Sequence, residues 1–194
     1  MKTLSLADRF PPGLVRLFAS LWFVVVFSFA WANPAQAQAQ RSVDVRLAIF
    51  GELTITKVND LDFGNIVAPV AGTVLMTATA NPTCTASAGL VQSGVCQPAE
   101  FGGRGETGRI VRIKKPPSNK ITLTGPGANM TITSLVLNGS PDLTLVQATS
   151  GYSRFRINSP TGIFEFRIGG TLNVGANQAP GVYTGTFQVD IQYN

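Results

Sequence analysis

The last fourteen residues of the chain, 181–194, alternate between apolar and polar side chains. Successive side chains of a β-strand point to opposite faces, so this pattern predicts a strand with one face in a core and the other in solvent. The predicted core positions of this closing strand are Tyr183, Phe187, Val189, Ile191 and Tyr193. Gly185 interrupts the apolar face, which indicates a bulge or a close backbone neighbour at that position.

The same period of two continues through almost the whole chain from residue 41 onward. Turn-forming residues, among them the pair Gly169-Gly170, separate about ten short runs. The clearest runs lie at residues 53–57, 73–79, 109–113, 120–124, 130–137, 143–147, 152–157, 163–168 and 171–174. Strands of this length and spacing predict an all-β domain, a β-sandwich of about 8–10 short strands.

Two neighbouring runs, 152–157 and 163–168, are joined by only five residues and are therefore predicted to form a hairpin. The charged side chains that would share its solvent face are Arg154, Arg156, Glu165 and Arg167. Such a group is either a binding patch or a solvated sheet face with modest cross-strand pairing. The solvated face is the favoured interpretation.

Residues 1–37 have the pattern of a bacterial secretory signal peptide, with a helical apolar segment. Three basic residues are followed by an apolar run of 15 residues, 17–31, and then by small residues that predict cleavage between Ala37 and Gln38, with a second possible site at 37–39. The alternative is an uncleaved anchor, but a spanning helix needs roughly 18 to 20 apolar residues.

Cleavage would leave an exported chain without a transmembrane anchor, since no later segment is apolar enough to span a membrane as a helix. We expect the mature protein in the periplasm, on the outer surface or outside a Gram-negative cell. The whole chain has a net charge of +5. Because the leader holds three basic residues and one acid, its removal would leave the mature chain with a net charge of +3. Its predicted parts are an N-terminal arm, 38–51, and a sandwich domain, 52–194.

The arm carries four apolar residues on one parity: Val43, Val45, Leu47 and Ile49. It is either the ordinary first strand of the sandwich or a donor strand that completes the sheet of a neighbouring subunit. If all four side chains become buried, they contribute roughly 6–12 kcal/mol before the cost of ordering the arm.

The only two cysteines, Cys84 and Cys96, both lie in the part predicted to be exported. In an oxidising compartment they are predicted to form a disulfide, which would close a loop of about 13 residues and stabilise the fold by ~3 kcal/mol. A redox pair would need Cys-x-x-Cys spacing, and a zinc site or an activated thiol would need further ligands or a histidine.

The residues that enzymes use for catalysis are sparse in this chain. It contains no histidine, so Ser-His-Asp and Cys-His systems are excluded. The nearest carboxylates, Asp60 and Asp62, flank a turn, where an acid usually caps the backbone. Residues 103–108 match G-x-G-x-x-G but precede a predicted strand, whereas a dinucleotide site needs a helix there. We expect no enzyme, no cofactor, no metal site and, with one small basic cluster at Lys114-Lys115, no nucleic-acid surface.

Residues 53–66 (LTITKVNDLDFGNI) and 162–194, with the pieces GGTL and PGVYTGTF, resemble the secreted bacterial family called domain of unknown function 4402. The C-terminal part is also similar to spore coat U and archaic chaperone–usher pilin subunits. The resemblance implies an Ig-like sandwich with an N-terminal donor segment, folded by a periplasmic chaperone and exported by an outer-membrane usher. Archaic pilins usually place a cysteine in their first strands, whereas both cysteines here lie at 84–96.

The expected function is therefore that of a structural subunit of a surface fibre or pilus-like assembly, which self-associates by strand complementation. A chaperone would engage the closing strand. The alternative is a self-contained β-sandwich that binds carbohydrate or another surface ligand at its loops, for which 102–108 and the disulfide loop are the candidates.

Overall fold

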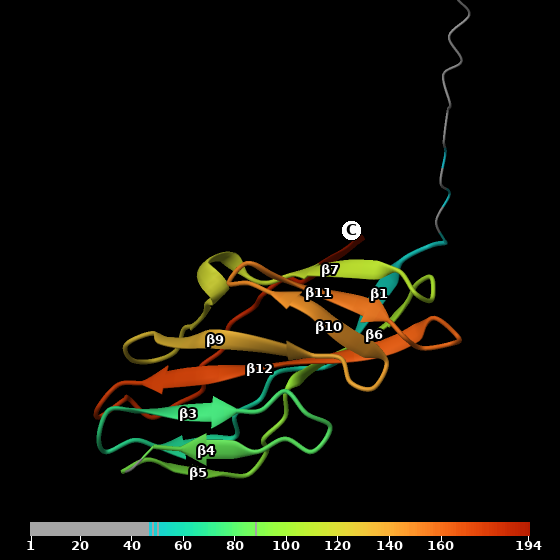
Figure 1. Ribbon diagram of the computed structural model, residues 1–194. Helices are drawn as coiled ribbons and strands as arrows, with labels where there is room; N and C mark the ends of the chain where they lie inside the picture. Colours follow the sequence, from blue (N-terminus) through green and yellow to red (C-terminus); the bar gives the residue numbers. More distant parts are fainter. Residues whose placement is uncertain (1–46, 48, 50, 88) are drawn as a thin grey trace, which may run out of the picture. The chain divides into compact units, whose positions relative to one another are not determined.

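A computed structural model describes residues 47, 49, 51–87 and 89–194, and all of these except Leu47 belong to one compact unit (Figure 1). The predicted leader, its cleavage site and Val43 and Val45 of the arm lie outside the described residues. The strands are β1 (Thr54–Asn59), β2 (Asn65–Val67), β3 (Gly72–Met76), β4 (Cys84–Ala86), β5 (Val91–Ser93), β6 (Ala99–Arg104), β7 (Ile110–Lys114), β8 (Ile121–Leu123), β9 (Met130–Asn138), β10 (Leu143–Ala148), β11 (Tyr152–Ile157), β12 (Ile163–Val174) and β13 (Asp190–Tyr193). One 3-10 turn, η2 (Pro117–Asn119), precedes β8.

The strands form two main antiparallel sheets and one small one. The seven-stranded sheet has the order β1-β6-β12-β3-β4, and β9 pairs with β12 and carries β8. The four-stranded sheet has the order β10-β11-β7-β13, while β2 and β5 pair separately. The predicted all-β class is confirmed, and the arrangement is that of a β-sandwich.

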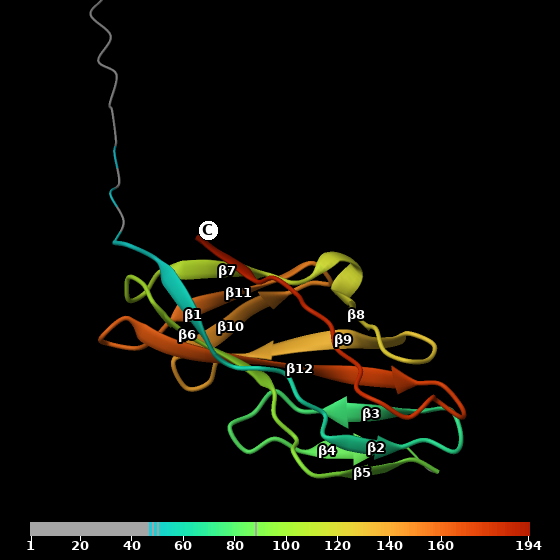
Figure 2. The same ribbon diagram turned by 180° about the vertical axis from the view of Figure 1, so that it is seen from behind.

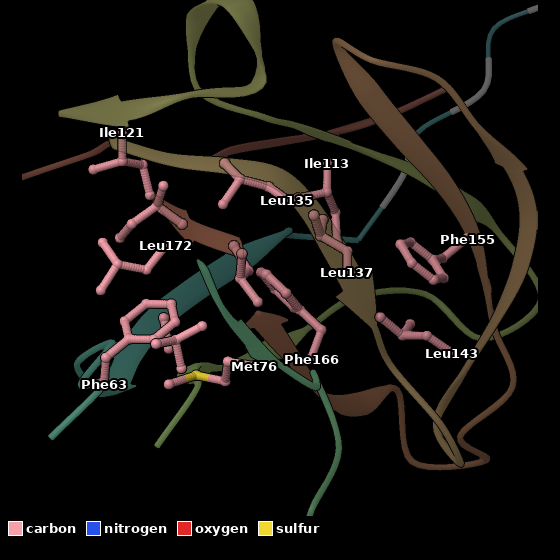
Figure 3. Packing of buried hydrophobic residues seen from close by; sticks show 14 of the residues in the cluster. Phe63, Met76, Ile113, Ile121, Leu135, Leu137, Leu143, Phe155, Phe166 and Leu172 are labelled. Carbon is pink, nitrogen blue, oxygen red and sulfur yellow. The ribbon is translucent and has the colours of Figure 1, made fainter. Parts of the chain in front are cut away.

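The core lies between the two main sheets (Figure 3). Phe155 of β11 and Leu143 of β10 point toward Leu137 of β9 and Phe166 of β12. Phe155 and Phe166, like Phe164 on β12, are fully buried. Each such side chain contributes about 1.5–3 kcal/mol relative to an exposed one, so the packing of β12 against β11 is a principal source of stability.

The prediction of a turn at Gly169-Gly170 is wrong, because both glycines continue the twelve-residue strand β12. In its C-terminal half, β12 has β3 on one edge and β9 on the other. A Cβ atom on Gly169 would lie 2.5 Å from the carbonyl oxygen of Met76, and one on Gly170 would lie 2.9 Å from Leu135. The two glycines therefore permit close approach of three strands.

The predicted hairpin of 152–157 and 163–168 is also wrong, because β11 and β12 belong to different sheets. β11 pairs with β10 and β7 instead, and the backbone N–H of Asn158 donates to the carbonyl oxygen of Asp142 at 2.8 Å. Two strands that face each other across a core show the same alternation as two strands of a hairpin. The short link therefore carries the chain from one sheet to the other.

The glycine-rich segment 102–108 is only partly a loop, contrary to prediction. Gly102 and Gly103 lie in β6, between β1 and β12. A Cβ atom on Gly103 would lie 2.5 Å from the ring of Phe164, so a glycine lets this ring fill the core beneath β6.

The predicted disulfide is confirmed. Cys84 at the start of β4 is bonded to Cys96, which follows β5, with the two Cα atoms 5.9 Å apart. A structural disulfide indicates an oxidising, extracytoplasmic environment. The described residues contain no helix with the length and hydrophobicity of a membrane span.

Candidate functional site

The C-terminal segment is paired at both ends and unpaired in its middle. β13 covers only Asp190–Tyr193 and pairs with β7, and Thr184 exchanges two backbone hydrogen bonds, 2.8 and 2.9 Å long, with Thr124. Between them, 185–189 belong to no ladder and make no backbone hydrogen bond to any other described residue. The single strand predicted over 181–194 is therefore interrupted, and its middle presents a free backbone edge.

The alternation of the segment survives this interruption. Phe187, Val189, Ile191 and Tyr193 are half-buried against the core, and the residues between them are exposed. The close backbone neighbour expected at Gly185 is Thr122, because a Cβ atom on this glycine would lie 2.3 Å from the Thr122 carbonyl oxygen.

Two tyrosine hydroxyls hold the segment at its ends. The hydroxyl of Tyr183 accepts a hydrogen bond from the N–H of Gly127 at 3.0 Å and donates one to the carbonyl oxygen of Ala179 at 2.9 Å. The hydroxyl of Tyr193 accepts a hydrogen bond from the N–H of Glu106 at 2.8 Å. The ends are thus fixed to loops of the sandwich, while 185–189 depend on side-chain packing alone.

A groove of about 380 Å³ lies beside this unpaired middle. Figure 2 shows the C-terminal segment crossing between β1 and β8, and residues of all three elements line the groove. Its apolar lining consists of Leu61, Ala99, Phe101, Ile121, Leu123, Ile132 and Phe187. Its polar lining consists of Lys57, Asn59, Asp60, Thr186 and the backbone of Gly185.

The groove reaches the hydrophobic core itself. Ala99, Ile121 and Ile132 are buried core residues that also line it. Phe101 forms part of the wall and stacks on the fully buried Phe166. An apolar side chain entering the groove would therefore contact the interior of the sandwich, at roughly 25 cal/mol for each Å² of apolar surface removed from water.

β1 supplies the opposite border of the groove through Lys57 and Asn59. Within the described part of the chain, β1 is an edge strand of its sheet and pairs only with β6. Edge strands present unpaired N–H and C=O groups to any strand that can lie beside them. The groove is thus flanked by the edge strand β1 and by the free edge of 185–189.

Two residues of the predicted donor segment, Leu47 and Ile49, lie among the described residues. Leu47 is 83% exposed and Ile49 is 86% exposed, and neither lies in a strand. Among the residues that the structure describes, the first strand begins at Thr54. In this structure, the two described residues of the arm are therefore exposed and lie outside the strands.

Other sequence features have structural explanations. The side chain of Asp62 accepts a hydrogen bond from the N–H of Gly64 at 2.8 Å, which is the backbone cap expected of this acid. Asp60 pairs with Lys57 at the rim of the groove, and the G-x-G-x-x-G match precedes β7, as expected. Among the described residues, no group of three or more Cys, Asp or Glu side chains could hold a metal ion.

A family model described as a domain of unknown function (DUF4402) matches residues 53–193. The chain belongs to the DUF4402 family. The match extends from the residue before β1 to the last residue of β13, so every residue that lines the groove lies within the DUF4402 domain. Neither a search of curated proteins nor a search of solved structures found a match.

Sequence reasoning identified one wall of the groove in this DUF4402 protein and missed the other. The sequence pattern predicts Phe187 on the core face of the closing strand, but it does not mark Phe101, Ile121 or Leu123 as residues of a groove. Ile121 and Leu123 share one parity of the run 120–124, which was the available signal. Phe101 lies among glycines, which concealed the strand β6.

Proposed function

We propose that this protein is an exported structural subunit of a surface fibre or pilus-like assembly, built by strand complementation. The arm residues Val43, Val45, Leu47 and Ile49 of one subunit enter the groove of the next and pair with the free edge of 185–189. The observation that carries the proposal is this edge, which borders an apolar groove that reaches the core.

The chemistry of the arm complements that of the groove. An added strand gains main-chain hydrogen bonds from an open edge and places alternate side chains in pockets. Leu47 and Ile49 are exposed apolar residues of the same parity, and the groove offers half-buried apolar walls at Leu61, Leu123 and Phe187. Burial of these surfaces against each other stabilises both chains.

The proposal includes assistance before assembly. An open groove and an unpaired edge promote aggregation until they are filled. A periplasmic chaperone that occupies the groove would prevent this, and an outer-membrane usher would then exchange the chaperone for the arm of the next subunit. The disulfide agrees with this route, because it indicates an oxidising compartment.

The test uses the exported full chain and two substitutions of equal charge. Ile49→Asp places a carboxylate on the face of the arm that would enter the groove, and Ala48→Asp places one on the opposite face. We expect Ile49→Asp to abolish multimers that resist detergent but dissociate on boiling, and Ala48→Asp to retain them. Equal multimer formation by both variants, or an inert wild-type monomer, would contradict the proposal.

A mixing experiment separates exchange between subunits from pairing within one subunit. Deletion of 38–49 leaves the groove but removes the arm, whereas Leu123→Lys leaves the arm but places a charge in the groove. We expect each variant alone to be monomeric and the mixture to form a heterodimer. Thr122→Lys, an exposed neighbour outside the lining, is the matched control for Leu123→Lys and should assemble normally. No heterodimer from the mixture would contradict exchange between subunits.

A further inference from the structure

The outer face of the four-stranded sheet carries four cations: Arg112 and Lys114 of β7, and Arg154 and Arg156 of β11. They are four of the ten Lys and Arg residues that the structure describes. Their alternating partners along both strands, such as Val111 and Phe155, are buried in the core. The pleat of β7 and β11 therefore gathers the cations on the side of the sheet away from the core.

The register places like charges opposite each other. Arg154 lies directly across from Arg112, with Lys114 across from Tyr152. Like charges directly opposite each other destabilise an antiparallel pair, so this arrangement has a cost in the folded protein. The acid expected to share a face with Arg154 and Arg156, Glu165, lies in the other sheet and approaches Arg167 instead.

The cations of this face make no ion pair with any residue that the structure describes. Asp190 of β13 lies across from Lys114 in the register, but the two form no ion pair. Arg154 donates one hydrogen bond to the side chain of Gln147 at 2.9 Å, while its buried Nε–H has no partner. Arg112 donates no hydrogen bond within the described chain and lies over the ring of Tyr152 instead.

Tyr152 holds the two arginines in place. The guanidinium carbon of Arg154 lies 5.1 Å from the centroid of its ring, and that of Arg112 lies 5.6 Å from it. Cation–π contacts at these distances partly offset the repulsion between the arginines. They orient the guanidinium groups, and of the N–H donors of the two arginines only one, on Arg154, is used in a hydrogen bond within the described chain.

We propose that this face binds an anionic polysaccharide through its carboxylate or sulfate groups. Guanidinium groups bind such planar or multidentate anions with paired N–H donors. Neighbouring strands lie ~5 Å apart and side chains of one parity lie ~7 Å apart along a strand, so the cations form a short two-dimensional array. An array of this kind matches a chain with repeated negative charges better than it matches a single small anion.

The observations favour a polysaccharide over a nucleic acid. Sheet surfaces that bind single-stranded nucleic acid stack successive bases on several aromatic rings, whereas this face has one, Tyr152. The disulfide also indicates a compartment outside the cytoplasm. None of the residues of this face lines the groove beside 185–189, so the proposal does not depend on strand complementation.

The test measures binding of the full-length purified protein to heparin and to alginate, with dextran as the neutral polysaccharide and duplex DNA as the competing polyanion. We expect binding to heparin or alginate at low salt and none to dextran, with affinity that falls as ionic strength rises. Arg112→Gln/Arg154→Gln and Lys114→Gln/Arg156→Gln should each lower the affinity about tenfold.

The matched control is Arg104→Gln/Lys120→Gln, which makes the same change in net charge at exposed positions outside this face. It should change the affinity less than about twofold, since it removes only long-range attraction. Thermal unfolding of each variant shows whether it is folded. The proposal is overturned if neither anionic polysaccharide binds, if DNA binds more tightly than both, or if folded face and control variants lose affinity equally.

Discussion

The ring of Phe101 stacks on the ring of Phe166, with the centroids 5.1 Å apart and the planes inclined by 11°. The two residues lie opposite each other in the pairing of β6 with β12. Phe166 has no exposed surface, whereas Phe101 is half-buried and lines the groove. The pair thus joins the core of the sandwich to the wall of the proposed strand-binding site.

Substitutions of these two phenylalanines should separate stability from binding. Phe166→Ala should lower the free energy of unfolding by about 3–5 kcal/mol, because it leaves a cavity in the core. Phe101→Ala should lower it by about 1–2 kcal/mol, because its ring is partly solvated already. Urea unfolding measures both values. Phe101→Ala should also weaken binding of a peptide of residues 41–50 to the arm-deleted protein, and unchanged affinity would argue against the proposed wall.

The glycines of β12 should be intolerant of a side chain. Gly169→Ala should destabilise the protein by about 2–3 kcal/mol, because the added Cβ meets the backbone of β3 and cannot be accommodated by a side-chain rotation. Gly151→Ala is the control, since no atom lies within 4 Å of its Cβ position, and it should change stability by less than about 0.5 kcal/mol. Equal effects of the two substitutions in thermal unfolding would refute the close packing of β12.

Removal of the disulfide should be costly but should not change the fold. Replacing both Cys84 and Cys96 by serine should lower the free energy of unfolding by ~3 kcal/mol, since the unfolded chain gains the freedom of the closed loop. Urea unfolding with and without reductant measures this difference in the wild type. The double variant should show no response to reductant, and a wild type that is equally insensitive would contradict the prediction.

Lys115 should make stability depend on pH. Its Nζ donates hydrogen bonds to the carbonyl oxygens of Leu135 and Thr149, both at 3.0 Å, and the residue is only 8% exposed. Burial lowers the pKa of Lys115 below its ordinary value of 10.5. Between the lowered pKa and 10.5 the unfolded chain binds more protons than the folded one, so the free energy of unfolding rises with pH in that window.

The variant Lys115→Met isolates this effect from the other titrating groups. It should be less stable than the wild type by about 1–3 kcal/mol, because two buried carbonyl groups lose their donor. The gap between wild type and variant should widen as the pH rises toward 10.5. A gap that stays constant or narrows in urea unfolding across this range would contradict the assigned burial of the ammonium group.

Local patterns in the sequence predicted much of the fold. The run 152–157 coincides with β11, and the cysteines pair as expected. These features depend on side-chain alternation, turn residues and loop closure, all of which operate over short distances along the chain. The half-buried positions of the alternate residues Phe187, Val189, Ile191 and Tyr193 were predictable for the same reason.

Long-range packing determined what the sequence did not reveal. Gly169 and Gly103 lie inside strands because of what packs against them, namely β3 and the ring of Phe164. Alternation alone could not show that β11 and β12 belong to different sheets. Because they do, Glu165 does not share a sheet face with Arg154. The groove depends on several distant segments meeting, and Phe101 showed no local sign of its place there.

Strand complementation requires the groove to accept the arm along the free edge of 185–189. The most direct measurement is amide hydrogen exchange of the arm-deleted protein, with and without a peptide of residues 41–50 and with a scrambled peptide as control. The peptide should slow exchange at 185–189 and in β1, since these amides gain partners or lose contact with solvent, while the scrambled peptide should not. Unchanged exchange at 185–189 under saturating peptide would contradict strand complementation.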